Sequence, residues 1–164
     1  MRTLMILSLG LMVFATHTWA ALNPEAVFIA DSRKTNHYIR DGLITGGDRA
    51  INDIVVQNIR HSRNQGYERV VIDIQGNRSG EPAAVERPPY FQVEVSPEMK
   101  RVIFTVWGKP KIGFDAKKII GGFRKTNVFS EIELLPVLEK DRWSFVMNLK
   151  KGHSVEVFEL KNPV

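Results

Sequence analysis

Three histidines follow residue 20 and are the residues best suited to hold a metal ion or to move a proton: His37, His61 and His153. None of them lies at metal-ligand spacing from another, whereas a zinc site usually includes at least one pair of ligands close in sequence. A pairing of His37 or His61 with Asp73 or Glu94 across the fold is left open. We therefore expect no metal site and no bound cofactor.

Nucleophilic catalysis has no clear residue to carry it, because the chain contains no cysteine and no serine in a Gly-x-Ser-x-Gly elbow. The glycines of residues 45–48 lack the order of a phosphate loop. Paired carboxylates for glycoside cleavage need not be close in sequence, so a small secreted hydrolase of wall polymer would use Asp73, Glu94, Glu131 or Glu133. The three glutamates fall on solvent-facing strand positions, and we expect no catalytic residue and a protein that is not an enzyme.

Basic and aromatic residues alternate at several places along the chain. Tyr67 lies beside Arg69, and Arg101 begins a stretch that ends at Trp107. Such pairs suit a carbohydrate or an anionic polymer, because aromatic faces stack on sugars while guanidinium groups bind carboxylates and phosphates. Trp143 falls in phase with a run of apolar residues and is expected in the core, whereas Trp107 is out of phase with its neighbours. The predicted ligand-binding residues are therefore Tyr67, Arg69, Arg101 and Trp107.

The first twenty residues have the layout of a secretory signal peptide. Arg2 precedes an apolar run over residues 4–15, and small residues stand three and one positions before Ala21. The run is about 12 residues long, whereas a helix needs about 20 to cross a bilayer. We expect residues 1–20 to be removed and the mature chain to have no transmembrane segment. The absence of cysteine indicates a bacterial envelope protein, periplasmic or otherwise exported.

The charge of the exported part favours an anionic partner. Without residues 1–20, 22 basic and 18 acidic residues remain, which gives a net charge of +4, and the pI of the whole chain is about 9.6. Cell-wall polymer, lipid headgroups and nucleic acid all fit this charge. Export removes the protein from most nucleic acid, so we expect peptidoglycan or an envelope protein as the partner and no nucleic acid.

Period-two alternation of apolar residues from residue 51 onward predicts a mainly β fold, a small sandwich of two packed sheets with one short helix. Residues 21–50 are expected to be a leader segment with one strand over residues 26–30. The other expected strands are residues 54–62, 68–75, 91–95, 102–106, 129–137, 143–149 and 155–160. Between them we expect a loop over residues 76–89, a hairpin turn over residues 96–100, and a helix from Ala116 to Ile120 that is capped by Asp115 and ended by Gly121-Gly122.

Two stretches resemble the AMIN family of bacterial envelope modules. Residues 66–74, Gly-Tyr-Glu-Arg-Val-Val-Ile-Asp-Ile, are similar to an early AMIN strand, and residues 153–163 resemble the segment whose Asn-Pro ending leads into the final strand. Over residues 51–164 the resemblance implies a β-sandwich that targets cell-wall amidases or secretin channels, binds peptidoglycan or an envelope partner, and has no catalytic activity. The chain lacks the strand that follows Asn-Pro in the family. Either another segment, such as residues 26–30, fills that edge or the two sequences are compared in the wrong register, and an unfilled edge implies an association site.

The sequence therefore predicts an exported, non-enzymatic binding module that attaches to peptidoglycan or an envelope partner through a basic, aromatic-bearing sheet face. Two alternatives stay open. One is the small secreted hydrolase. The other is a β-sandwich that binds a lipid or small apolar ligand in a cavity lined by Phe91, Phe104, Trp143 and Phe145.

Overall fold

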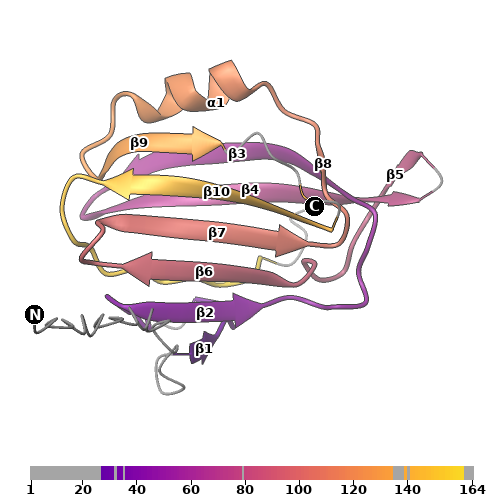
Figure 1. Ribbon diagram of the computed structural model, residues 1–164, viewed down its shortest axis with the longest axis horizontal. Coiled ribbons are helices and arrows are strands. Elements are labelled where there is room, and N and C mark those ends of the chain that lie inside the picture. The colour runs from indigo at the N-terminus through magenta and orange to yellow at the C-terminus, as the bar shows by residue number, and fades with distance from the viewer. Residues whose placement is uncertain are drawn as a thin grey trace, which may run out of the picture.

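The computed structural model describes residues 27–31, 33–34, 36–78, 80–134, 139 and 141–160, without the side chains of residues 78 and 82. Its strands form two sheets (Figure 1). In sheet order, the larger sheet contains β1 (Val27–Ile29), β2 (Gly42–Gly46), β6 (Phe91–Ser96), β7 (Arg101–Trp107), β10 (Arg142–Leu149) and β9 (Phe129–Leu134). The smaller sheet contains β5 (Glu81–Ala83), β4 (Tyr67–Arg78), β3 (Ile54–Asn64) and β8 (Lys111–Ile112). With the short helix α1 (Ala116–Phe123), this confirms the predicted fold class.

The core lies between the sheets and follows from the alternation of side chains along each strand. On β10 every second side chain from Trp143 to Leu149 points inward, and Trp143 is 2% exposed, which confirms it as a core residue. The rings of Phe91, Phe104, Phe145 and Trp143 contact one another in that order, with centroids 5.2–6.0 Å apart. These are the rings that would line a lipid cavity, and here they fill the centre of the core.

β1 and β2 belong to the larger sheet, whereas the sequence predicts a leader segment with one strand up to residue 50. β1 lies within the strand expected there, and β2 is an additional strand that pairs with β6. The glycines of this stretch suggest a loop, but Gly46 lies within the strand. A Cβ atom at Gly46 would lie only 2.6 Å from Cζ of Phe91 on β6. The absence of a side chain therefore allows β2 to pack here, and the sandwich begins before residue 51.

β3 and β4 form a long hairpin around Gly66, whose φ of 84° suits the turn between them. The register shifts between Val56 and Asn58, which is a bulge. Before the bulge Ile54 and Val56 are buried, and after it the buried position is Ile59. The bulge keeps both halves of β3 in contact with the core.

The loop predicted over residues 76–89 is wrong in its first part. β4 continues to Arg78 and pairs with β5. Pro82 is compatible with β5 because β5 is an edge strand, where a missing N–H leaves no ladder hydrogen bond broken. The strand predicted over residues 129–137 is present as β9 up to Leu134, and residues 135–138 lie outside the described residues.

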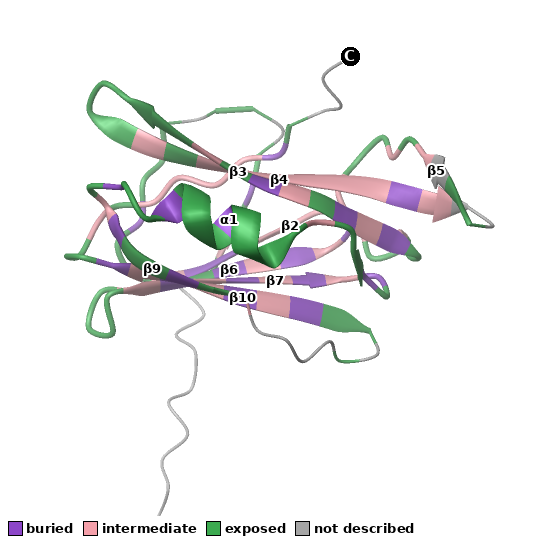
Figure 2. Ribbon diagram, turned by 90° about the horizontal axis from the view of Figure 1, so that it is seen from above, coloured by how far each residue is buried: buried purple, intermediate pink, exposed green. Residues whose placement is uncertain are grey.

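The helix α1 lies along one side of the sandwich, where it contacts β9 and β3 (Figure 2). Asp115 caps it as predicted, since its carboxylate accepts hydrogen bonds from two backbone N–H groups of the first turn. The predicted end at Gly121-Gly122 is wrong, because α1 continues to Phe123. Ile119 and Phe123 lie four residues apart and are both buried. Their burial outweighs a helix-propensity cost of about 1 kcal/mol per glycine.

Residues 153–160, here called the C-terminal strap, run behind β6 in Figure 1. The strand predicted over residues 155–160 is wrong, because this stretch makes isolated bridges from Val155 to Ile39 and from Phe158 to Asp31. Its partners belong to the irregular connection between β1 and β2, which offers no continuous ladder. Val155 and Val157 pack against the core, so the strap covers the interior without forming a strand.

Candidate functional site

The four residues predicted to bind a ligand do not come together in one site. Tyr67 and Arg69 are exposed at the start of β4, in the smaller sheet. Arg101 and Trp107 lie at opposite ends of β7, in the larger sheet. The Arg69 guanidinium is directed to the strap, where it lies 5.7 Å from the ring centroid of Phe158. A binding role for each of the four residues stays a prediction, and they cannot act as one cluster.

Trp107 instead lies beside residues that the sequence analysis did not select. Its ring centroid is 5.1 Å from that of Tyr90, and the Arg49 guanidinium lies 4.1 Å from the same Tyr90 ring. On the next strand, Arg142 is the register partner of Trp107. These four residues are here called the cation–aromatic row. Since the neighbouring Val106 is fully buried, the row lies on the outer face of the larger sheet, as the phase of Trp107 predicts.

The two ends of the row differ in charge. Arg142 donates two hydrogen bonds to the Glu139 carboxylate, at 2.7 and 2.8 Å. These hydrogen bonds, together with the positive charge of Arg142, hold the pKa of Glu139 below its usual value despite some desolvation. Arg142 is therefore oriented by an ion pair with a carboxylate, whereas Arg49 lies over a ring. The Arg49 end is the more attractive one for an anion.

A single glycine places Arg49 over Tyr90. Gly47 has a φ of 77°, and a Cβ atom there would lie 2.0 Å from the carbonyl oxygen of Pro89. This close approach allows the Asp48 backbone to donate to Pro88 O and to accept from the Tyr90 N–H, both at 2.9 Å. The chain after β2 is thereby joined to the chain before β6, which carries Tyr90.

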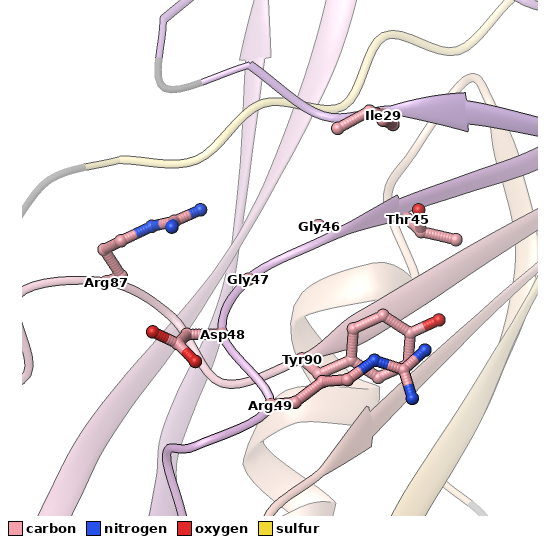
Figure 3. A pocket seen from close by; sticks show the side chains of 8 residues that line it. All are labelled: Ile29, Thr45, Gly46, Gly47, Asp48, Arg49, Arg87 and Tyr90. Atoms are coloured by element: carbon pink, nitrogen blue, oxygen red, sulfur yellow. The ribbon is translucent and has the colours of Figure 1, made fainter.

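A pocket of about 430 Å³ adjoins the row at the end of β2 (Figure 3). Arg49 and Tyr90 form one wall, and Arg87 stands on the far side of the Gly46-Gly47 backbone. The pocket is lined by Ile29, Thr45, Gly46, Gly47, Asp48, Arg49, Arg87 and Tyr90. Two guanidinium groups, one aromatic face and the Asp48 carboxylate therefore surround a floor of glycine backbone.

The C-terminal strap supports this pocket through Glu159. The Glu159 side chain is 5% exposed, and its carboxylate accepts a 2.7 Å hydrogen bond from the Gly47 N–H. The same oxygen lies 3.6 Å from Nη2 of Arg87, whose side chain is 55% exposed. Glu159 thus pairs with one nitrogen of the Arg87 guanidinium, and the half-exposed guanidinium keeps further N–H donors for a ligand.

Sequence reasoning missed Arg49, Arg87 and Tyr90 because each lies outside the strands where alternation is informative. The available signals were the Gly46-Gly47 pair, which requires a special backbone, and the Pro88-Pro89 pair directly before Tyr90. Neither signal reveals that the two segments touch. The two segments touch because Asp48 pairs with Pro89, about 40 positions further along the chain.

The histidine pairing left open by the sequence has a different partner. His61 Nε2 lies 2.8 Å from Oε2 of Glu68, whereas Asp73 binds Arg60. Burial disfavours the charged form of Glu68, but hydrogen bonds from the Asn127 N–H and from His61, together with attraction to His61 and Arg63, hold its pKa below the usual value.

The surroundings of this pair are those of a structural contact. The His61 ring lies 5.1 Å from Phe123 and 5.8 Å from Phe129, and both phenyl rings belong to the core. The pair joins the β3–β4 hairpin to the turn after α1, where Glu68 holds the Asn127 N–H at 2.8 Å. It lies in the interior at the α1 side and contributes nothing to the cation–aromatic row.

In the part of the chain that the structure describes, no group of three or more His, Asp or Glu residues is placed to hold a metal ion. No helix among the same residues is both long and apolar enough to span a bilayer. Comparison with protein-family models, curated proteins and solved structures found no match. The resemblance to the AMIN family therefore stays a prediction.

Proposed function

We propose that the chain is an exported, non-enzymatic module that binds peptidoglycan through the cation–aromatic row and the adjoining pocket. The observation that carries the proposal is the placement of Arg49 over the Tyr90 ring, with Trp107 in tilted contact with Tyr90 and Arg87 nearby at the end of β2. The signal-peptide layout, the positive charge and the AMIN-like stretches favour the same function.

The chemistry of the site suits a polymer of sugars that carries carboxylates. Tyr90 and Trp107 are half-buried, so each ring is fixed by packing while one part stays open to a ligand. Aromatic faces of this kind stack on the C–H surfaces of sugars. The guanidinium groups of Arg49 and Arg87 match the planar geometry of carboxylates.

The size and position of the site also suit a segment of a long ligand. The pocket has a volume of about 430 Å³ and is widely open to solvent, as a site for one segment of a continuous polymer must be. The pocket lies at the end of a strand, and the row continues from it across β6, β7 and β10. One unit of the polymer can therefore occupy the pocket while its neighbours lie over the rings.

The test is co-sedimentation of the protein with purified insoluble sacculi at low and at physiological salt. We expect pelleting that weakens with salt, because part of the attraction is between exposed charges. Arg49→Ala and Trp107→Ala should each lower the apparent affinity about tenfold or more. Arg69→Ala is the matched control, since it removes the same charge from the other sheet and should leave binding near the wild-type value.

Three outcomes are distinguishable. Loss of binding in Arg69→Ala with full binding in Arg49→Ala would move the site to the smaller sheet. Equal small losses of sacculus binding in Arg69→Ala and Arg49→Ala would indicate a general attraction between charges and no defined site. No pelleting at either salt would refute wall binding, and the row would then be tested as a surface for an envelope protein by cross-linking at position 107.

A further inference from the structure

The positive charge of this protein is concentrated in one short segment. Residues 109–125, here called the basic segment, contain six lysines or arginines and a single acidic residue, Asp115. Their net charge of +5 equals the formal net charge of the whole chain, so all other residues together sum to zero. The cation–aromatic row lies outside this segment. A second surface therefore carries the electrostatic character of the molecule.

The fold spreads this charge along the outside of the α1 side. The basic segment includes β8 and α1, and Figure 1 shows the chain rising from β8 into α1 along that side. All six basic residues are exposed, namely Lys109, Lys111, Lys117, Lys118, Arg124 and Lys125. Asp115 is the one acidic residue among them and is already counted in the net charge of +5; its carboxylate accepts hydrogen bonds from the N–H groups that begin α1.

The apolar residues of the basic segment divide into two kinds. Phe114 is half-buried with its ring centroid 5.7 Å from Trp143, and Phe123 is 3% exposed, so both rings are turned to the core. Ile112 and Ile120 are exposed by 38% and 39%. The surface thus presents aliphatic side chains and cations without an aromatic platform for stacking sugars.

We propose that the basic segment docks the protein on the surface of an anionic phospholipid bilayer. Lysine and arginine near such a surface are attracted to the phosphate-rich headgroup layer, and exposed aliphatic side chains gain by entering the interface. The open positions at Gly121 and Gly122, where a Cβ atom would meet nothing within 4 Å, leave the outer side of α1 flat. Charge complementarity selects anionic lipid, and the inward aromatic rings argue against a polysaccharide on this face.

The experiment uses the protein expressed from the full-length sequence, with its N-terminus identified by mass spectrometry. Binding is measured by flotation with vesicles of phosphatidylcholine alone and of phosphatidylcholine with about one-third phosphatidylglycerol. We expect binding to the anionic vesicles and little to the neutral ones. Lys117→Gln with Lys118→Gln should lower binding to anionic vesicles about 25-fold, since each basic residue near the surface contributes about fivefold.

The matched control is Lys100→Gln with Lys151→Gln, which removes the same charge from two exposed positions outside the basic segment. It should bind anionic vesicles like the wild type, and thermal unfolding by circular dichroism checks that both double variants fold. Equal binding to both kinds of vesicle, or equal losses in the two double variants, would overturn the proposal. The proposal would also be overturned if the Lys117/Lys118 double variant kept vesicle binding and lost sacculus binding, because the basic segment would then bind cell-wall polymer. None of these results bears on the Arg49 and Trp107 variants.

Discussion

The two sides of the sandwich are held in different ways. On the α1 side, Ile119 and Phe123 enter the core from a helix that follows β8 directly along the chain. A long-range hydrogen bond, from the Asn127 N–H to Glu68, accompanies their burial. On the side of the C-terminal strap, hydrogen bonds link residues far apart: Glu159 reaches Gly47 across 112 positions. Apolar burial tolerates small shifts, whereas a hydrogen bond needs its partner at one distance. The α1 side should therefore keep its surface when its packing shifts slightly. The strap side should hold the residues of the pocket at fixed positions.

The largest expected effect is on the α1 side. Phe123→Ala removes a ring that is 3% exposed and contacts both Phe129 and His61. We expect a loss of about 3–5 kcal/mol in the free energy of unfolding, measured by urea titration. Ile120→Ala, on the partly exposed flank of the same helix, is the control and should cost less than about 1 kcal/mol. Similar losses in the two variants would mean that α1 is not anchored through Phe123.

On the strap side, the corresponding change is Glu159→Ala. It leaves the Gly47 N–H without its acceptor, and we expect a loss of about 1–3 kcal/mol by the same urea titration. Glu159→Gln keeps an acceptor oxygen and should cost clearly less. If the two variants lose the same stability, the contribution comes from the ion pair with Arg87 and not from the hydrogen bond.

A smaller effect is expected in the pH dependence of the free energy of unfolding, through Glu68 on the α1 side. Because the pKa of Glu68 is lowered in the folded protein, its carboxylate contributes stability above its unfolded pKa of about 4.3, and this stability is lost as the pH falls through the folded value. We expect the free energy of unfolding of the wild type to fall more steeply between about pH 5 and pH 3 than that of Glu68→Gln. Parallel curves for the two proteins would contradict the lowered pKa.

The smallest effect is expected at the exposed end of the cation–aromatic row. Glu139→Gln breaks the ion pair with Arg142, but exposed pairs contribute little to stability. Its urea midpoint should equal that of the wild type within error. The variant frees the Arg142 guanidinium, so sacculus binding should stay equal or become tighter. A weaker interaction with sacculi would show that the Glu139 carboxylate itself contacts the ligand.

Several features were predictable because they depend on neighbours in sequence. The alternation along β6, β7 and β10 indicates which side chains face the core, the Asp115 cap marks the start of α1, and the phase of Trp107 places it on the outer face. Errors arose where packing overrides local preference. Glycines that predict a loop lie inside β2, and glycines that predict a helix end lie inside α1.

By itself, the sequence determined the two-layer β architecture, the inward and outward faces of its main strands, and the net positive charge of residues 109–125, because each of these depends on residue type and short-range periodicity. Only the tertiary structure decided that Arg49 stacks on Tyr90, that Tyr90 meets Trp107, and that Glu159 supports Arg87. These contacts join segments tens to more than a hundred residues apart. These contacts form because the backbone at Gly47 approaches Pro89 closely and because the strap passes beside Gly47. Neither feature can be read from a local sequence pattern.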